Sequence, residues 1–149
     1  MKLVFLGDSI TQGAGATVES ARYVDRVAQK FECTALNYGL SGTRIARQSR
    51  VSENTLLDLD FRLRLTVVDR DCDFIFVFGG TNDYGHGDVK LGCFDDRDVY
   101  TFYGAFHELI AYMVSSFPKG RLCFILPIPR YNQDNPHGEG GIKQEPVGD

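Results

Sequence analysis

The chain has 149 residues, of which 43% are hydrophobic and 24% are charged, and its formal net charge is -4. This composition excludes a disordered or low-complexity protein and favours one domain with a hydrophobic core. The basic residues form no patch that would bind nucleic acid, and no apolar stretch is long enough to cross a membrane. The apolar start is too short for a signal-peptide core, so we expect a cytoplasmic protein.

The first part of the chain predicts a strand, a helix and a second strand. Residues Lys2–Leu6 form a short apolar run that stops at Gly7, as a buried strand does. Apolar side chains at helical spacing then predict a helix over Ala21–Phe31. The segment Cys33–Leu36 predicts the second strand, which ends at the turn-rich segment Asn37–Gly42.

The second part of the chain continues this alternation. Residues 59–67 alternate between apolar and polar side chains as a strand does, but a connection between parallel strands needs a helix, so we favour a helix over Phe61–Val68. The continuously apolar segment Phe74–Phe78 predicts a strand that is covered on both faces. A helix is predicted over Val99–Phe117 and a fourth strand over Leu122–Leu126.

Strands that alternate with helices indicate an α/β domain with a mostly parallel sheet. We expect this domain to occupy residues 1–130. Residues 131–149 are rich in glycine and proline and predict a loop or a disordered tail. Because no amphipathic element follows the fourth strand, we expect a domain that is incomplete at its C-terminus. A fragment of a longer protein explains this better than a truncated gene.

Three loops that follow predicted strands carry distinctive residues, at the edge of a parallel sheet where ligands bind. Their sequences are GDSI at 7–10, NYGLSG at 37–42 and GGTND at 79–83. Taken singly, Ser9 can cap a helix, Gly42 can be a turn glycine, and Asn82 can form an Asx-turn. Taken together they suit acyl transfer, because a serine hydroxyl would lie beside backbone and amide N–H donors that form an oxyanion hole.

These motifs resemble those of the SGNH (GDSL-type) esterases and lipases, in order and spacing, over about residues 2–130. The resemblance implies that Ser9 is the nucleophile, that Gly42 donates a backbone N–H and that Asn82 donates from its side chain. It implies a flavodoxin-like three-layer α/β/α fold with five parallel strands, of which the final strand and helix are missing here. It implies a small-molecule ester as substrate, an acyl-serine intermediate, and neither a metal nor an organic cofactor.

The family's fourth motif, Asp-x-x-His, supplies the general base, and this chain ends before its expected position. Two stretches match the motif by letter. The stretch Asp83–His86 directly follows Asn82, and the stretch Asp134–His137 lies in the tail. We expect both histidines to be solvated loop residues and His107 to be structural. The sequence therefore predicts a chain that lacks its general base, and it leaves the oligomeric state open.

Two alternatives to an active serine ester hydrolase are considered. One is a scaffold of the same fold that is truncated or has lost catalysis. The other is an FMN-binding module, because residues 9–13 loosely resemble a flavodoxin phosphate loop, although this leaves the other two motifs unexplained. Residues 13–18 lack the third glycine of a dinucleotide-binding motif. We therefore favour a serine esterase or lipase that acts on small acyl esters.

Overall fold

The computed structural model of the chain describes residues 1–127, apart from the side chain of His86. Within these residues a four-stranded sheet is formed by β1 (Lys2–Gly7), β2 (Thr34–Gly39), β3 (Phe74–Phe78) and β4 (Arg121–Ile125). The strand order is β2-β1-β3-β4, and every neighbouring pair is parallel. The predicted α/β class with a parallel sheet is therefore confirmed.

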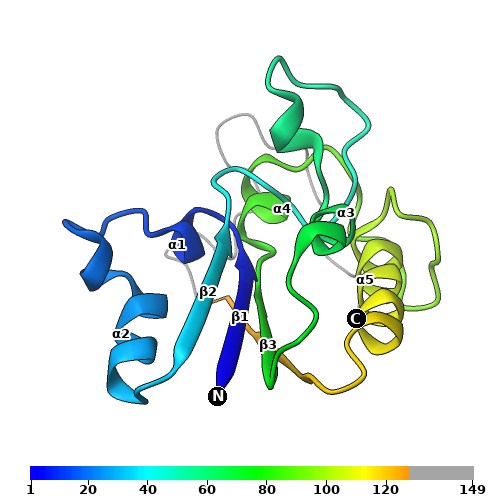
Figure 1. The fold of residues 1–149 in the computed structure, drawn as a ribbon. Helices are drawn as coiled ribbons and strands as arrows, with labels where there is room; N and C mark the ends of the chain where they lie inside the picture. The colour runs from blue at the N-terminus through cyan, green and yellow to red at the C-terminus, as the bar shows by residue number, and fades with distance from the viewer. Residues whose placement is uncertain (128–149) are drawn as a thin grey trace.

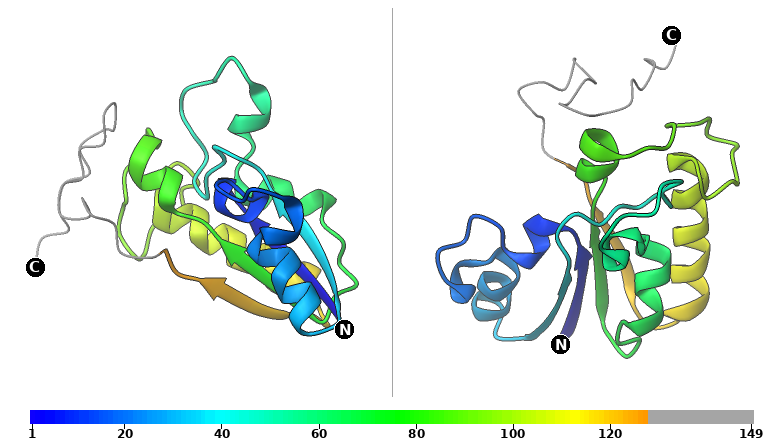
Figure 2. Two further views of the ribbon diagram at one scale, coloured as in Figure 1. Left: turned by 90° about the vertical axis from the view of Figure 1, so that its left-hand side faces the viewer. Right: turned by 90° about the horizontal axis from the view of Figure 1, so that it is seen from above.

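Helices cover the two faces of the sheet and complete three layers, as Figures 1 and 2 show. One face carries α1 (Ser9–Gln12) and α2 (Tyr23–Lys30), and the other carries α3 (Phe61–Arg64) and α5 (Phe102–Ser116). The short helix α4 (Thr81–His86) lies beyond the carboxyl end of β3. Short 3-10 turns are found at Glu19–Ala21, Thr55–Asp58 and Leu65–Val67. This is the flavodoxin-like arrangement that we expected.

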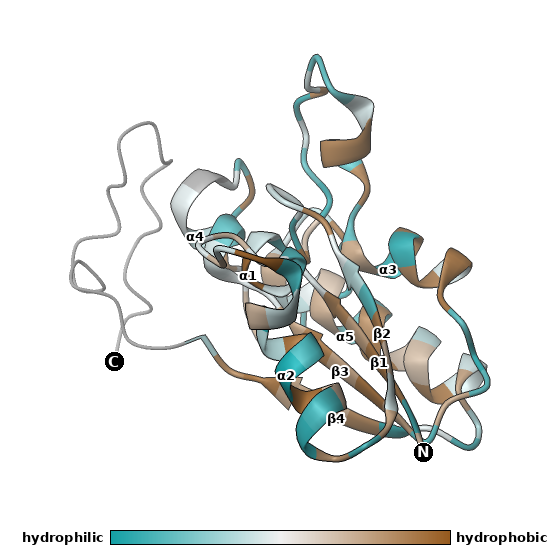
Figure 3. Cartoon of the chain, turned by 60° about the vertical axis from the view of Figure 1, so that its left-hand side comes forward, coloured by the Kyte–Doolittle hydropathy of each residue, from teal (hydrophilic) through white to brown (hydrophobic). Residues whose placement is uncertain are grey.

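The larger hydrophobic core lies between the sheet and the helices α3 and α5. Val4 and Ile75 contribute from the strands, Leu109 from α5, and Phe61 and Leu65 from the helical segment, and all five side chains are fully buried. Phe61 and Leu65 are four residues apart, so they share one face of a helical turn. The helix favoured over residues 61–68 is thereby confirmed, as α3 followed by the 3-10 turn. Figure 3 shows the apolar strands β1 and β3 inside the molecule and the more polar helix α2 at its surface.

A smaller core lies on the opposite face, under α2. It consists of Leu3, Phe5 and Val24, and the Phe5 ring stacks on that of Phe76 at 4.7 Å between centroids. Because α2 lies over β1 and β2, the side chains of Phe74 and Phe76 are only half-buried. The expectation that this strand is covered on both faces is therefore wrong for this face.

Several predicted boundaries move by one to three residues, α5 and β4 among them, and two of the shifts have clear local reasons. Helix α2 begins at Tyr23 because Arg22 has an extended backbone, with ψ at 144°, and its guanidinium binds the Asp25 carboxylate at 2.6 Å. Strand β2 continues through Asn37, where we expected a turn. The Asn37 amide donates to the carbonyl of Thr11 at 2.8 Å and its oxygen accepts the N–H of Gly39 at 2.9 Å, so a polar side chain is satisfied within a strand.

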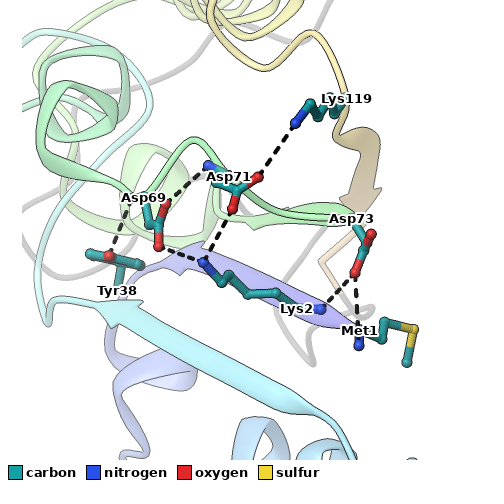
Figure 4. Close-up of polar contacts among 7 residues, drawn as sticks. All are labelled: Met1, Lys2, Tyr38, Asp69, Asp71, Asp73 and Lys119. Atoms are coloured by element: carbon teal, nitrogen blue, oxygen red, sulfur yellow. Dashed lines mark hydrogen bonds and ion pairs between the residues drawn. The ribbon is translucent and has the colours of Figure 1, made fainter.

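The amino-terminal edge of the sheet is held by exposed ion pairs (Figure 4). The Lys2 ammonium lies 3.0 Å from the Asp69 carboxylate and 3.9 Å from that of Asp71. The Asp73 carboxylate accepts the backbone N–H of Lys2 at 2.7 Å. Exposed pairs of this kind stabilise a protein only weakly. These contacts hold the segment that precedes β3 against the start of β1. This end of the sheet is opposite the end that carries the three motifs.

Candidate active site

The structure brings the three motif loops together at the carboxyl edge of the sheet. Ser9 follows β1, Gly42 follows β2, and Asn82 follows β3. Strands β2 and β3 both pair with β1, so these loops leave three adjacent strands. Figure 1 shows α1 and α4 beyond the same end of the sheet. Ser9, Gly42 and Asn82 thus occupy the edge at which the sequence placed the chemistry.

Ser9 is the first residue of α1, but it does not cap this helix. The N-cap is Asp8, whose buried carboxylate accepts the N–H of Ile10 at 2.9 Å. Burial raises the pKa of Asp8, while the Ile10 N–H and the charge of Arg64 oppose the shift. The structural explanation of Ser9 as a helix cap is therefore wrong. Because Asp8 takes that role, the half-buried Ser9 is not required as a capping group.

The loop of Gly42 is tied to the Ser9 loop by two hydrogen bonds. The backbone N–H of Leu40 donates to the Gly7 carbonyl at 3.0 Å, and that of Ser41 donates to the Gln12 side chain at 2.7 Å. Gly42 itself has a φ of 79°, a conformation that side-chain-bearing residues rarely adopt. A Cβ at this position would lie 3.1 Å from a methyl group of Leu57.

Replacing Gly42 with alanine is expected to destabilise the protein by about 1–2 kcal/mol, because the left-handed backbone is strained with a Cβ. The new methyl group also presses on Leu57, whose side chain must give way by a few tenths of an ångström. Gly15→Ala is the matched control, since Gly15 has a φ of 85° but open space around it. Urea unfolding should show a loss in both variants. A larger loss in Gly15→Ala than in Gly42→Ala would contradict this account.

Asn82 reaches across to the Gly42 loop. The residue is 9% exposed, and its amide nitrogen donates to the Thr43 carbonyl at 3.0 Å. An asparagine amide carries two N–H donors, so this bond orients the group and uses one of them. The loops after β2 and β3 are therefore joined at the residue that follows Gly42.

The acidic residues after Asn82 hold the same loop by its backbone. The buried Asp83 carboxylate accepts the N–H of Ile45 at 3.0 Å and that of Ala46 at 2.8 Å. Asp88 accepts the N–H groups of residues 49 and 50 at 2.9 and 2.7 Å. The sequence indicated Asp83 only as a letter of the third motif. Its role as a buried acceptor has no signal in one sequence, because the partners are backbone groups about forty residues away.

Burial raises the pKa of Asp83 to about 6, although the two backbone N–H bonds oppose the shift. The folded protein therefore binds this proton more tightly than the unfolded chain, whose carboxyl has a pKa near 3.8. The resulting stability is fully present below about pH 4 and is lost as the pH rises through 6.

Asp83→Asn removes this titration. The unfolding free energy of the wild-type chain relative to that of Asp83→Asn should fall by about 2.4 kcal/mol between pH 4 and pH 7, at about 1.4 kcal/mol per unit of pKa shift. Urea titrations of both proteins at several pH values measure the difference. A difference that is constant over this range would contradict the assignment.

The histidines do not provide a general base among the described side chains. His107 lies on α5, across the sheet from α1, and its Nε2 is 2.7 Å from the carbonyl oxygen of Phe94. This contact supports the expected structural role of His107. His86 is the last residue of α4. The other candidate, His137, and the predicted tail of residues 131–149 lie outside the described residues.

Two further findings concern residues 1–127 alone. In this part of the chain, no three His, Cys, Asp or Glu side chains come together as a metal site would require. No helix in the same residues combines the length and hydropathy needed to cross a membrane.

A three-layer α/β fold with serine, glycine and asparagine loops at one edge defines the class of the SGNH-type hydrolases. The chain belongs to the GDSL-like lipase/acylhydrolase family, whose model matches residues 5–144. The resemblance drawn from the three motifs is thereby confirmed at the level of the family. Membership supports a hydrolase of the acylhydrolase type.

Solved structures support the same fold. A protein from Lactobacillus plantarum is 34% identical, with a TM-score of 0.70, and the match covers 85% of this chain and 56% of that one. A carbohydrate acetylesterase family member from Sinorhizobium meliloti is 17% identical, with a TM-score of 0.59, and the match covers 96% of this chain and 72% of that one.

A family two carbohydrate esterase from Clostridium thermocellum, solved in complex with cellohexaose, is 18% identical with a TM-score of 0.60. That match covers 89% of this chain and 45% of the esterase. No curated protein matches the chain. The chain spans 62% and 56% of the length of two of the structures that it matches.

Proposed function

We propose that the protein is a serine ester hydrolase in which Ser9 is the nucleophile. The observation that carries the proposal is the position of Ser9, Gly42 and Asn82 on three adjacent loops at one edge of the sheet. Membership of an acylhydrolase family supports the same reaction class. Asp8, and not Ser9, caps α1. The Ser9 hydroxyl is therefore not needed to stabilise the helix, which supports a role for it in the reaction.

In the proposed reaction the Ser9 hydroxyl attacks the carbonyl carbon of an ester, and its proton passes to a general base. The carbonyl oxygen becomes an oxyanion, which accepts the backbone N–H groups of Ser9 and Gly42 and the second amide N–H of Asn82. The alcohol leaves with the proton from the base, and water then hydrolyses the acyl-serine. The base is not assigned to a residue. No metal or organic cofactor takes part in the proposal.

We propose small acyl esters as the substrate class. Two similar structures are described as a carbohydrate esterase and a carbohydrate acetylesterase family member, which supports acetyl groups on sugars as one such substrate. The proposal names no nucleic-acid or membrane partner, and a cytoplasmic location stays a prediction from the sequence.

The test is labelling of the 149-residue chain with a fluorophosphonate probe, which reacts with activated serines. We expect one adduct by intact mass, which peptide mapping places on Ser9, and this result would correct the prediction from the sequence that the chain lacks its general base. A folded chain that acquires no adduct, or acquires it elsewhere, would overturn the proposal and favour the catalytically inactive scaffold.

A further inference from the structure

Arg64, the last residue of α3, places a buried guanidinium beneath the candidate site. Its side chain is one of the few charged groups in the interior, and the residue is 7% exposed. One nitrogen, Nη1, donates to the carbonyl of Gly7 at 2.9 Å and to the hydroxyl of Thr43 at 2.7 Å. The other, Nη2, donates to the carbonyl of Tyr38.

These three acceptors belong to the segments that present the motif residues. Gly7 ends β1 and leads through Asp8 into Ser9, while Tyr38 lies near the end of β2. Thr43 directly follows Gly42, and its carbonyl accepts the amide of Asn82. One guanidinium therefore contacts the first two segments directly and reaches the third through a single residue.

The environment of Arg64 favours one fixed orientation of its planar guanidinium group. The Phe61 ring lies 5.2 Å from the centre of the guanidinium, and the Asp8 charge acts on it favourably. Desolvation lowers the pKa of Arg64 to about 10, so the group stays charged at neutral pH. A planar fork that donates in two directions at fixed angles has no equivalent in lysine.

Stability alone does not explain a cation at this position. Hydrophobic replacement of buried ionic groups is often neutral or stabilising, whereas a cation carries a desolvation cost. What a hydrophobic residue cannot do is hold two carbonyls and a hydroxyl from separate segments at defined distances. Catalytic groups misplaced by about 1 Å can lose about 10²-fold in rate, so such a device has a functional use.

We propose that Arg64 is a positioning residue, whose guanidinium fixes the Gly42 and Asn82 donors relative to Ser9. The inference rests on the proposed serine ester hydrolase function. It assigns no contact between Arg64 and the substrate. Arg64 acts through Gly7, Tyr38 and Thr43.

The main test compares Arg64→Met and Arg64→Lys with the control Arg62→Met in hydrolysis of p-nitrophenyl acetate. Arg62 lies on the same helix but points away, 3.3 Å from the Glu108 carboxylate and over the Tyr112 ring. We expect kcat to fall about 10–100-fold in Arg64→Met, with KM within about twofold, because donors that act in the transition state are displaced. Arg64→Lys should recover only part of the loss, and Arg62→Met should keep the wild-type kcat.

A second pair of variants covers the case in which Arg64→Met does not fold. Thr43→Val removes the hydroxyl acceptor and leaves Arg64 in place, while Thr43→Ser keeps the hydroxyl. We expect a kcat about 10-fold lower in Thr43→Val and a kcat near the wild-type value in Thr43→Ser. Folded Arg64→Met or Thr43→Val protein with an unchanged kcat would overturn the inference, as would an effect on KM alone.

Amide hydrogen exchange separates a failure of this inference from a failure of the proposed function. If the wild-type chain shows no hydrolysis that depends on Ser9, the proposed function fails, and exchange then decides the role of Arg64. Faster exchange of the Ile45 and Ala46 amides in Thr43→Val, but not in Thr43→Ser or Arg62→Met, supports a positioning role. Exchange that is the same in all variants overturns it.

Discussion

Ser9→Ala is expected to abolish ester hydrolysis, with a fall in kcat of roughly 10⁴-fold or more. Alanine keeps the backbone N–H of residue 9 and removes only the hydroxyl that we propose forms the acyl-enzyme. Asp8 caps α1 through its own carboxylate, so the helix does not depend on the Ser9 side chain. The variant should therefore fold as the wild type does. Hydrolysis of p-nitrophenyl acetate and thermal unfolding measure the two effects separately.

Ser20→Ala is the matched control for this replacement. Ser20 is an exposed serine in the 3-10 turn at Glu19–Ala21, beyond α1 in the chain. It should keep the wild-type rate and the wild-type labelling by a fluorophosphonate. Ester hydrolysis that survives in Ser9→Ala at the wild-type rate would refute Ser9 as the nucleophile.

Asn82→Ala is expected to lower kcat by about 10²–10³-fold, with little change in KM. The amide donor proposed for the oxyanion acts on charge that develops in the transition state, so its loss affects turnover more than binding. The variant also loses the bond to the Thr43 carbonyl, which costs stability of about 0.5–1.5 kcal/mol. Steady-state kinetics with p-nitrophenyl acetate, at a temperature where both proteins are folded, provide the comparison.

Asn54→Ala serves as the control for Asn82→Ala. The exposed Asn54 caps the 3-10 turn at Thr55–Asp58 by accepting the N–H of Leu56 at 3.1 Å. Its replacement removes an asparagine and a local hydrogen bond without touching the motif loops. An Asn82→Ala protein with an unchanged kcat and a raised KM would mean that Asn82 binds the ground state of the substrate. That result would count against an oxyanion role.

The strands and helices could be predicted because hydrophobic periodicity determines them locally. The apolar run of β3 and the stripe of α5 reflect contacts that every buried strand or helix must make. The end of β2 could not be found in this way, since Asn37 is typical of a turn. Its amide is satisfied only when α1 supplies the Thr11 carbonyl. The half-exposed face of β3 was also hidden, because it depends on where α2 lies.

The candidate site was predictable in its motifs and not in the groups that hold them in place. Ser9, Gly42 and Asn82 stand out because their residue types and their positions after strands suit one reaction. Arg64 does not stand out, since a charged residue on a helix is usually solvated. Its burial is a property of the tertiary structure, where Gly7, Tyr38 and Thr43 provide acceptors from distant parts of the chain.

The order of the strands has a consequence for the way in which the site is assembled. Strand β1 pairs with β2, its near neighbour in the chain, and with β3, where Leu3 lies opposite Phe74. Loop closure over the longer segment is the slower event. During synthesis the loops of Ser9 and Gly42 are available before Asn82 has been made. We therefore expect the return of Ser9 labelling by a fluorophosphonate during refolding to follow the pairing of β1 with β3.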